Sequence, residues 1–291
     1  MRQFLAFDIG GTHIKYGIVD ETGKILSKGL LDTEAYLGGM AIINKLIAVS
    51  KDITMTHTID AIAISTAGQV DSSTGTIVGA GETIPNYTGL EVKALVSKAL
   101  NLPVEVRNDV ECAALGEMWL GNHDSSNLFV LTIGTGIGGA IVIDNKIYSG
   151  HTCKAGECGY MLVEGEPFEK NASITGLIRY VQRNKEYRSW TGKEIFKRYD
   201  QGDETCKVAV AHFYKHLAIG IANLVYIFNP EKVIIGGALT GRGELFLEEV
   251  KLEVQKYLQP GFYSDTEIVL AKLGNNAGMI GAVYHFLERN N

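Results

Sequence analysis

The sequence predicts an α/β fold made of two similarly built halves. Apolar segments rich in Val, Ile and Phe alternate with segments whose apolar residues have helical spacing. The plan of residues 3–29, in which a strand, a glycine turn, a second strand, a polar turn and a third strand follow one another, returns in residues 127–150. A repeated plan of this kind indicates two domains of related construction.

The opening stretch, LAFDIGGTHIKYGIVD, predicts a β-hairpin with strands at residues 4–9 and 13–19. Gly10 and Gly11 can supply the positive φ angles of a tight turn between them. Asp8 at the strand end and Thr12 beyond the turn are not required by such a turn. Their presence suggests a ligand.

The remaining elements of the first half alternate between strand and helix. The apolar strand at residues 59–68 ends in small residues, as expected where a buried strand delivers a loop to a site. The others are a strand at 23–33, a helix at 38–53, a helix at 90–101, a strand at 102–109 and a helix at 110–121. We expect the domain boundary in or after that last helix, near Gly121.

The second half begins with the repeated hairpin and continues with a loop at residues 149–160. A long helix at residues 206–228 ends where Asn229-Pro230 stops helix propagation. Further elements are helices around residues 172–184 and 193–199, a buried strand at 232–239, a strand at 267–273 and a final helix at 277–288.

Composition excludes several classes of protein. The 291 residues are 46% hydrophobic and 21% charged, with a net charge of −6 and no Lys/Arg cluster, so we expect no nucleic-acid partner. The chain enters a strand at once, and no apolar stretch looks long enough to span a bilayer. We therefore expect a cytoplasmic protein without a membrane partner. The four cysteines are sparse and indicate reduced thiols.

Three glycine loops offer backbone N–H groups to a phosphate or nucleotide. They are Gly10-Gly11-Thr12, Gly134-Thr135-Gly136 and Gly236-Gly237. One such loop alone is typical of a plain turn, but three in this strand context favour a nucleotide. The spacing Gly134-x-Gly136-x-x-Gly139 matches the dinucleotide fingerprint, which opens a helix; here the chain continues as a strand, so we reject that interpretation.

These loops resemble those of the ROK family of sugar kinases. DIGGTHIKYGIVD resembles the family's first phosphate signature, LTIGTGIGGAIV the second phosphate loop and VIIGGAL the adenosine loop, in the expected order. The resemblance implies a two-domain actin-like ATPase (ribonuclease H-like) fold, with mixed sheets flanked by helices. It implies domains at residues 1–120 and 121–275, a helix at 276–291 that returns to the first, and ATP and sugar in the cleft between them.

The resemblance also assigns the nucleotide residues. Asp8 would hold Mg²⁺ directly or through water, and Lys15 would address phosphates, although a lysine in an alternating strand can equally be solvated. The remaining candidates are glycines and threonines of the three loops: Gly10, Gly11, Thr12, Gly134, Thr135, Gly136, Gly236 and Gly237.

The sugar residues of the first half follow from VRNDVECAA, which is similar to the family's Asn-Asp pair. Asp109 is then the candidate base and Asn108 a sugar ligand; alternatively either residue caps the following helix, and the roles can coexist. Gly68 and Asn86 occupy the family's other sugar positions in this half, although Asn86 alone would pass as a turn residue.

In the second half, Glu157 in GECGYM and Glu169 in FEKNASITGL match the family's sugar-binding glutamates. Tyr160 stands where the family has a histidine, and residues 161–168 contain none of the family's zinc-binding cysteines. We therefore expect no structural zinc. A site rebuilt from His151, Cys153 and Cys158 would lack the family's order and spacing and a fourth ligand.

The predicted function is an ATP:sugar phosphotransferase acting on the 6-hydroxyl of a glucose unit. The resemblance implies that the histidine replaced by Tyr160 lies near C1 and C2 of the sugar, so a β-glucoside such as cellobiose is the preferred substrate hypothesis; glucokinase and N-acetylmannosamine kinase are the alternatives. A sugar-responsive regulatory protein is an alternative of another class, and an actin- or chaperone-like ATPase would not need Glu157 and Glu169. The resemblance further implies a homodimer.

Overall fold

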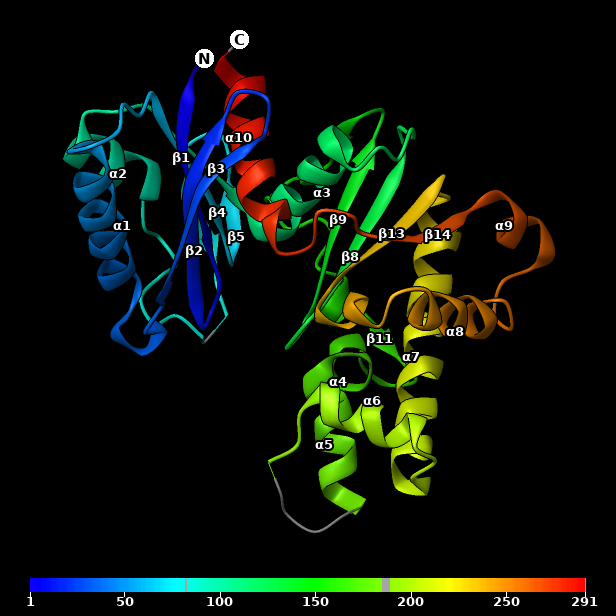
Figure 1. Cartoon of the computed structure of the whole chain (residues 1–291). Helices are drawn as coiled ribbons and strands as arrows, with labels where there is room; N and C mark the ends of the chain where they lie inside the picture. The colour runs from blue at the N-terminus through cyan, green and yellow to red at the C-terminus, as the bar shows by residue number, and fades with distance from the viewer. Residues whose placement is uncertain (82, 185–188, 291) are drawn as a thin grey trace. The chain divides into compact units, whose positions relative to one another are not determined.

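The computed structural model describes residues 1–81, 83–184 and 189–290 (Figure 1). Its internal contacts divide the chain into two compact units. The first contains Met1–Asp124, Ser149–Ala155 and Asn275–Asn291, and the second contains Ser125–Tyr148 and Gly156–Gly274. The short segment Ser149–Ala155 thus belongs to the first unit, although both its sequence neighbours belong to the second. Asn291, the last residue of the expected final helix, lies outside the described residues.

The first unit is built on a five-stranded mixed sheet of order β3-β2-β1-β4-β7. Strand β1 is antiparallel to β2 and parallel to β4, which is parallel to β7. The strands are β1 (Gln3–Ile9), β2 (His13–Asp20), β3 (Ile25–Asp32), β4 (Ala61–Thr66) and β7 (Val104–Asn108). The helices are α1 (Gly39–Thr54), α2 (Val92–Leu100), α3 (Asp109–Leu120) and α10 (Ala277–Asn290).

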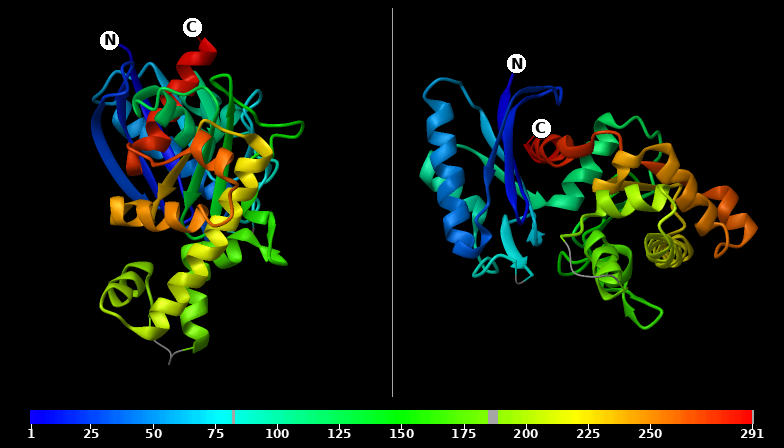
Figure 2. Two further views of the ribbon diagram at one scale, coloured as in Figure 1. Left: turned by 90° about the vertical axis from the view of Figure 1, so that its right-hand side faces the viewer. Right: turned by 60° about the horizontal axis from the view of Figure 1, so that its bottom comes forward.

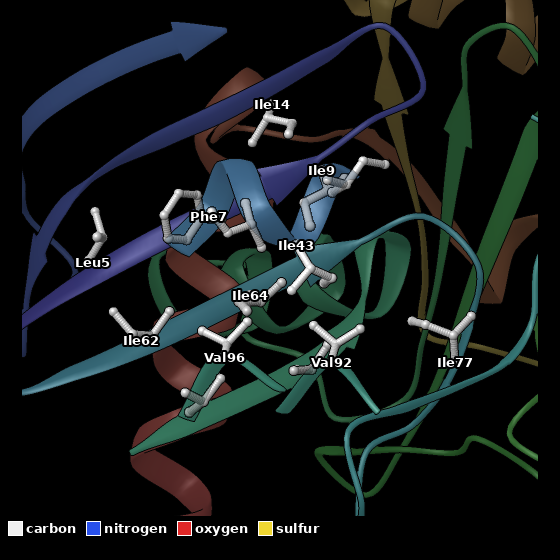
Figure 3. Packing of buried hydrophobic residues seen from close by; sticks show 14 of the residues in the cluster. Leu5, Phe7, Ile9, Ile14, Ile43, Ile62, Ile64, Ile77, Val92 and Val96 are labelled. Atoms are coloured by element: carbon white, nitrogen blue, oxygen red, sulfur yellow. The ribbon is translucent and has the colours of Figure 1, made fainter. Parts of the chain in front are cut away.

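Both faces of this sheet are buried. Leu5, Phe7 and Ile9 of β1 join a core cluster with residues of α1 and α2 (Figure 3). Phe4 and Ala6 point to the opposite face, where their cluster includes residues of α3 and α10. A strand buried on both faces reads as a continuous apolar run. Asp8 is the one charged residue in β1 and interrupts this apolar run.

The second unit repeats this sheet. Its order is β10-β9-β8-β13-β14, with β8 antiparallel to β9 and parallel to β13. The strands are β8 (Leu128–Ile133), β9 (Ile137–Ile143), β10 (Lys146–Ile147), β13 (Lys232–Gly237) and β14 (Glu267–Leu270). The predicted repeat is therefore confirmed, and so is the rejection of a dinucleotide fingerprint, because β9 follows the glycine turn as a strand.

The helices of the second unit gather around α7. They are α4 (Phe168–Ala172), α5 (Ile174–Asn184), α6 (Gly192–Asp200), α7 (Glu204–Phe228), α8 (Glu244–Val254) and α9 (Pro260–Asp265). Helices α5 and α6 lie beside the amino-terminal half of α7 (Figure 2). We expected no stretch that could span a bilayer, and this was wrong for α7. By length and composition alone, α7 could cross a membrane. Its most apolar window is 67% buried, as in a helix that forms a domain core.

Several short elements were not predicted from the sequence, because they are too short to show a periodic spacing of apolar residues. They are the hairpins β5 (Gln69–Asp71) with β6 (Thr76–Gly79) and β11 (Leu162–Val163) with β12 (Glu166–Pro167), and the 3₁₀ turns η1 (Ala35–Leu37), η2 (Cys158–Tyr160), η3 (Ala238–Arg242) and η4 (Gly274–Asn276). The four cysteines are free thiols, as predicted.

The turn between β1 and β2 differs from its expected geometry. The N–H of Gly10 donates to the carbonyl of His13 at 3.0 Å, which closes the turn. Neither Gly10 nor Gly11 has a positive φ, so that expectation was wrong. A Cβ atom on Gly11 would lie 3.0 Å from Cγ2 of Thr83. Glycine at position 11 therefore provides space for a neighbouring segment rather than backbone freedom.

A buried polar network joins four segments of the first unit. The guanidinium of Arg107 donates from Nε to Oε2 of Glu111 at 2.9 Å, and its Nη1 lies 3.2 Å from Nδ1 of His285. The hydroxyl of Ser149 donates to Oε1 of Glu111 at 2.6 Å, which ties the segment Ser149–Ala155 to α3. Burial, with the charge of Arg107, lowers the pKa of His285 to about 3.

His285 should make the first unit sensitive to acid. The imidazole stays neutral when folded, whereas in the unfolded chain it binds a proton below about pH 6.5, so stability falls as the pH drops from that value toward 3. In the wild type, His285 should lower the free energy of unfolding by about 1 kcal/mol between pH 6 and pH 5. We expect His285→Asn, whose Oδ1 can still accept from Arg107, to lose about 1 kcal/mol less than the wild type over this interval. Urea unfolding at both pH values measures this difference. The control is His57→Asn, at an exposed histidine of the same unit; an equal pH dependence in both variants would contradict the prediction.

Candidate active site

The candidate residues of the first unit lie at the carboxyl ends of its parallel strands. Asp8 of β1 is the register partner of Ser65 in β4, and Thr66 is the partner of Asn108 in β7. Gly68 follows β4, and Asp109 begins α3 directly after β7. In open α/β sheets ligands bind outside the carboxyl ends of the strands. The fold therefore brings residues from distant parts of the sequence to the edge where a ligand is expected.

Asp8 is held by two side chains and a helix end. The hydroxyl of Ser65 donates to its Oδ1 at 2.8 Å, and Nζ of Lys15 lies 3.1 Å from its Oδ2. A Cβ atom on Gly278 would come within 2.6 Å of Oδ1, so the amino end of α10 lies directly against this carboxylate. The helix dipole favours an anion there. Lys15, which the resemblance assigns to phosphates, contacts Asp8 in this structure.

Asn108 caps α3 and fixes the candidate base. Its Oδ1 accepts from the N–H groups of Val110 and Glu111 at 2.9 and 3.0 Å. Its Nδ2 donates to the carbonyl of Gly68 at 2.9 Å and to Oδ1 of Asp109 at 3.0 Å. The capping alternative is thus confirmed for Asn108. All four hydrogen bonds that this amide can make are formed within the chain, so its clearest role is to orient Asp109.

Tyr87 joins this edge and was missed by the sequence analysis. Asn86, with φ of 53°, precedes Tyr87, whose hydroxyl lies 2.6 Å from Oγ1 of Thr66. Burial raises the pKa of Tyr87 to about 12, and the charge of Asp109 also contributes. The hydroxyl therefore stays protonated at neutral pH and close enough to feel the charge of Asp109. Nothing in the sequence around Tyr87 distinguishes it from a core tyrosine.

The two glycine loops of the second unit lie at one edge of its sheet. The β8–β9 turn is closed by the N–H of Gly134, which donates to the carbonyl of Gly136 at 3.0 Å. Gly237, in the neighbouring strand β13, pairs with Ile133 and has φ of +99°. A Cβ atom on Gly237 would lie 2.2 Å from the carbonyl oxygen of Ile133. Glycine is required there both by conformation and by space.

The sugar candidates of the second unit gather beside the β8–β9 turn. Oε2 of Glu169 lies 3.4 Å from the N–H nitrogen of Ile137, and a Cβ atom on Gly136 would come within 2.6 Å of the same oxygen. The ring of Tyr160 is largely exposed. Partial burial of its hydroxyl, followed by the charges of Glu157 and Glu169, raises the pKa of Tyr160. The side chains of Glu157, Tyr160 and Glu169 are therefore close enough to interact electrostatically. The hydroxyl of Tyr160 stays neutral and can donate a hydrogen bond.

A pocket of about 790 Å³ in the second unit begins where β13 ends. The guanidinium of Arg242 stacks 4.4 Å above the ring of Phe196 and donates to both carboxylate oxygens of Asp200. The pocket is lined by apolar, charged and polar residues from α5, α6 with its C-cap, and η3: Ile174, Gly192, Lys193, Phe196, Lys197, Asp200, Gln201, Ala238, Leu239, Gly241 and Arg242. The sequence analysis missed it, because α6 meets η3 only in the folded chain.

The candidate metal ligands do not form a cluster of their own. Within residues 1–81, 83–184 and 189–290, no group of three or more His, Cys, Asp or Glu side chains is placed to hold a metal ion. His151 and Cys153 belong to the first unit and Cys158 to the second. Burial raises the pKa of Cys158 to about 12, so its thiol stays protonated and is a poor metal ligand.

Comparisons with known proteins agree with this arrangement. The ROK family matches residues 4–289. A β-glucoside kinase of Listeria monocytogenes is 34% identical over 303 residues, and the alignment covers 98% of each chain. The solved structure of a Listeria monocytogenes protein, proposed to be an N-acetylmannosamine kinase, is 32% identical with a TM-score of 0.89 and covers 99% of this chain and 100% of its own.

A second solved structure is that of a ROK family glucokinase from Streptomyces griseus in complex with glucose and AMPPNP. It is 28% identical to this chain, has a TM-score of 0.85 and covers 97% of this chain and 98% of its own. These matches run over nearly the whole length of each protein. The chain therefore belongs to the ROK family and has its actin-like ATPase fold.

Proposed function

We propose that this protein, a carbohydrate kinase of the ROK family, transfers the γ-phosphoryl group of ATP to the 6-hydroxyl of a glucose unit in a β-glucoside such as cellobiose. The observation that carries the proposal is the fixed carboxylate of Asp109 at the carboxyl end of β7. Its Oδ1 accepts from Nδ2 of Asn108 at 3.0 Å and from the N–H of Val110 at 2.9 Å. Phosphoryl transfer needs such a group to orient the attacking hydroxyl and accept its proton.

This proposal assigns sugar-binding roles to residues in each of the two units. Gly68 and Asn86 shape the loops beside Asp109, and Asn108 positions the base. Glu157 and Glu169 accept hydrogen bonds from sugar hydroxyls, and Tyr160 donates one. Carboxylates suit this task because each accepts several hydrogen bonds and discriminates sugars by which hydroxyls are present.

The nucleotide is proposed to occupy the glycine loops and the pocket of the second unit. The pocket fits a base and ribose because it combines the apolar walls of Ile174, Phe196 and Leu239 with nearby lysines. Phosphates are assigned to Gly11, Thr12 and Lys15 of the first unit and to Thr135 and Gly136 of the second. Gly10, Gly134, Gly236 and Gly237 shape these loops, since the N–H groups of Gly10 and Gly134 are used by their own turns.

Asp8 fits a magnesium ion that is held mainly by phosphates and water. Each of its oxygens has one partner in the chain, Ser65 or Lys15, and each keeps a lone pair for a hard cation. Bound Mg²⁺ would neutralise charge on the transferring phosphoryl group. Lys15, within reach of Asp8, would add a second positive charge at the same place.

Tyr160 supports a β-glucoside as the substrate. Its exposed aromatic ring beside Glu157 and Glu169 offers a flat surface for a second sugar ring linked through C1. The β-glucoside kinase relative agrees with this assignment. Glucose and N-acetylmannosamine are the alternative substrates, in line with the two solved relatives. A sugar-responsive regulatory role is less favoured, because Asp109 and three nucleotide loops are present together.

The test is kcat/KM for cellobiose, glucose and N-acetylmannosamine in one coupled ADP-release assay. We expect cellobiose to be preferred about 10-fold, since one well-placed contact discriminates by roughly that factor. A preference for either monosaccharide would contradict the β-glucoside assignment, and sugar binding without any sugar-dependent ADP release would support the regulatory role. The 6-hydroxyl is tested with a 6-deoxy analogue, which should bind without being phosphorylated. A cytoplasmic homodimer completes the proposal, and light scattering in solution tests its dimeric part.

A further inference from the structure

A very short hairpin separates the two glutamates of the second unit that the proposed function assigns to the sugar. Glu157 precedes η2, and Glu169 lies in the first turn of α4. Between them, β11 and β12 form only two paired positions, Leu162 with Pro167 and Val163 with Glu166. An isolated hairpin of this size is not stable in water, so something outside the hairpin must fix it.

Glu164 connects the turn of this hairpin to α7. Glu164 and Gly165 have φ of 50° and 85°, which is the pattern of a two-residue type I′ turn. Asparagine is the usual residue at the first of these positions, and glutamate is strained there. The side chain of Glu164 instead reaches Lys215, 2.7 Å from its Oε1, and Nε2 of His216, 3.2 Å from its Oε2. The hydrogen bond from Lys215 lowers the pKa of Glu164.

An apolar contact fixes the other end of the hairpin to the same helix. The N–H of Phe168 donates to the carbonyl of Met161 at 2.7 Å, which closes the base of the hairpin. The ring of Phe168 is fully buried, and a Cβ atom on Gly220 of α7 would lie 2.2 Å from it. Glycine at position 220 therefore makes room for this ring.

The contacts of Glu164 continue toward α4. His216 is buried, and its Nδ1 lies 2.7 Å from the carbonyl oxygen of His212 one turn earlier. The ring of His212 stacks on Tyr180 of α5 at 4.4 Å, and its Nε2 lies 3.4 Å from Oδ1 of Asn171 in α4. Glu169 thus lies between Phe168 and Asn171, both of which contact α7.

We propose that Glu164 is a positioning residue for sugar binding, and that it acts by holding the β11–β12 hairpin against α7 through its contact with Lys215, beside Nε2 of His216. The inference rests on the proposed function, because it assigns Tyr160 and Glu169 to the sugar. When the Glu164 contacts are lost, the turn of the hairpin is no longer connected to α7, and only the Phe168 contact at its base remains. Tyr160 and Glu169 are then held less firmly, while Asp109 is unchanged. The effect on the nucleotide loops is smaller, because Glu169 touches one of them, the β8–β9 turn, and Glu164 touches none.

The test uses Glu164→Asn in the full chain. Asparagine suits the type I′ turn, so the turn itself is retained, but its side chain is too short to reach α7. We expect the KM for the sugar to rise about five-fold, with kcat and the KM for ATP changed less than two-fold. Lys215→Met should give the same pattern from the other side of the contact. The matched control is Glu166→Gln in the same hairpin. The carboxylate of Glu166 pairs with Lys170 on the surface, and we expect its replacement by an amide to leave all three constants unchanged.

Amide hydrogen exchange of residues 162–172 gives a readout that does not depend on turnover. Faster exchange in Glu164→Asn than in Glu166→Gln is expected whether or not the right sugar has been found. Equal exchange in the two variants, an unchanged sugar KM, or equal changes in the constants for sugar and ATP would each overturn the positioning role. If the wild-type protein shows no sugar-dependent turnover, the proposed function fails, and the exchange experiment still decides the role of Glu164.

Discussion

Asp109→Asn is expected to lower kcat about 10³-fold, within the range that general base catalysis contributes. The amide keeps the size of the carboxylate, and its oxygen can still accept from Asn108 and Val110 at the positions that Oδ1 uses now. It cannot take up the proton of the sugar hydroxyl. The measurement is kcat by ADP release, together with the dissociation constant of the sugar by calorimetry, which should change only a few-fold.

The control for this variant is Asp52→Asn, which removes a carboxylate from the exposed side of α1 in the same unit. It should retain wild-type turnover. A near-normal kcat in Asp109→Asn would show that Asp109 is not the base. A large loss of sugar affinity with normal kcat would instead make Asp109 a binding residue only.

Gly281→Ala is expected to destabilise the first unit by about 3 kcal/mol, at the upper end of the usual cost of overpacking. A Cβ atom at position 281 would lie 1.7 Å from the carbonyl oxygen of Cys112 and 2.8 Å from the nitrogen of Gly116. Both are backbone atoms of α3, so no side-chain rotation relieves the clash and α10 must move away. Trp119 reports this movement by its fluorescence, because its ring lies 5.3 Å from that of Tyr284 in α10.

The comparison variant is Gly261→Ala in α9, where a new Cβ atom would meet nothing within 4 Å. There alanine should be neutral or slightly stabilising, by up to about 1 kcal/mol, since it is the better helix former. Urea unfolding of both variants measures the contrast. Equal stability of Gly281→Ala and wild type would mean that α3 and α10 are not packed as closely as the structure has them.

The fold and the loops could be predicted because their signals are local in the sequence. Asp8 is conspicuous as a charge inside a strand buried on both faces, and the glycine turn after β8 repeats the one after β1. Asn108 could be read both as a cap and as part of a site, since a side chain at the start of a helix serves either purpose. The structure shows it in the capping role, with the orientation of Asp109 as a consequence.

The remaining features depend on contacts between residues far apart in the chain. Glu164 contacts Lys215, 51 positions later, and nothing in the sequence around either residue predicts this contact. The pocket of the second unit combines α6 with η3, and Tyr87 meets Thr66 only after the loop between them has folded back. Sequence periodicity describes the burial of single elements, so it cannot report which elements become neighbours.

The placement of the segment Ser149–Ala155 in the first unit has a consequence for recombination between related genes. The backbone passes from one unit to the other at four places, after Asp124, Tyr148, Ala155 and Gly274. A chimaera with a single junction near residue 124 would pair β1 of one parent with α10 of the other, and would separate Ser149 from its Glu111 partner. Exchange of a complete first unit requires three separate pieces, so recombination at a single junction transfers neither unit whole.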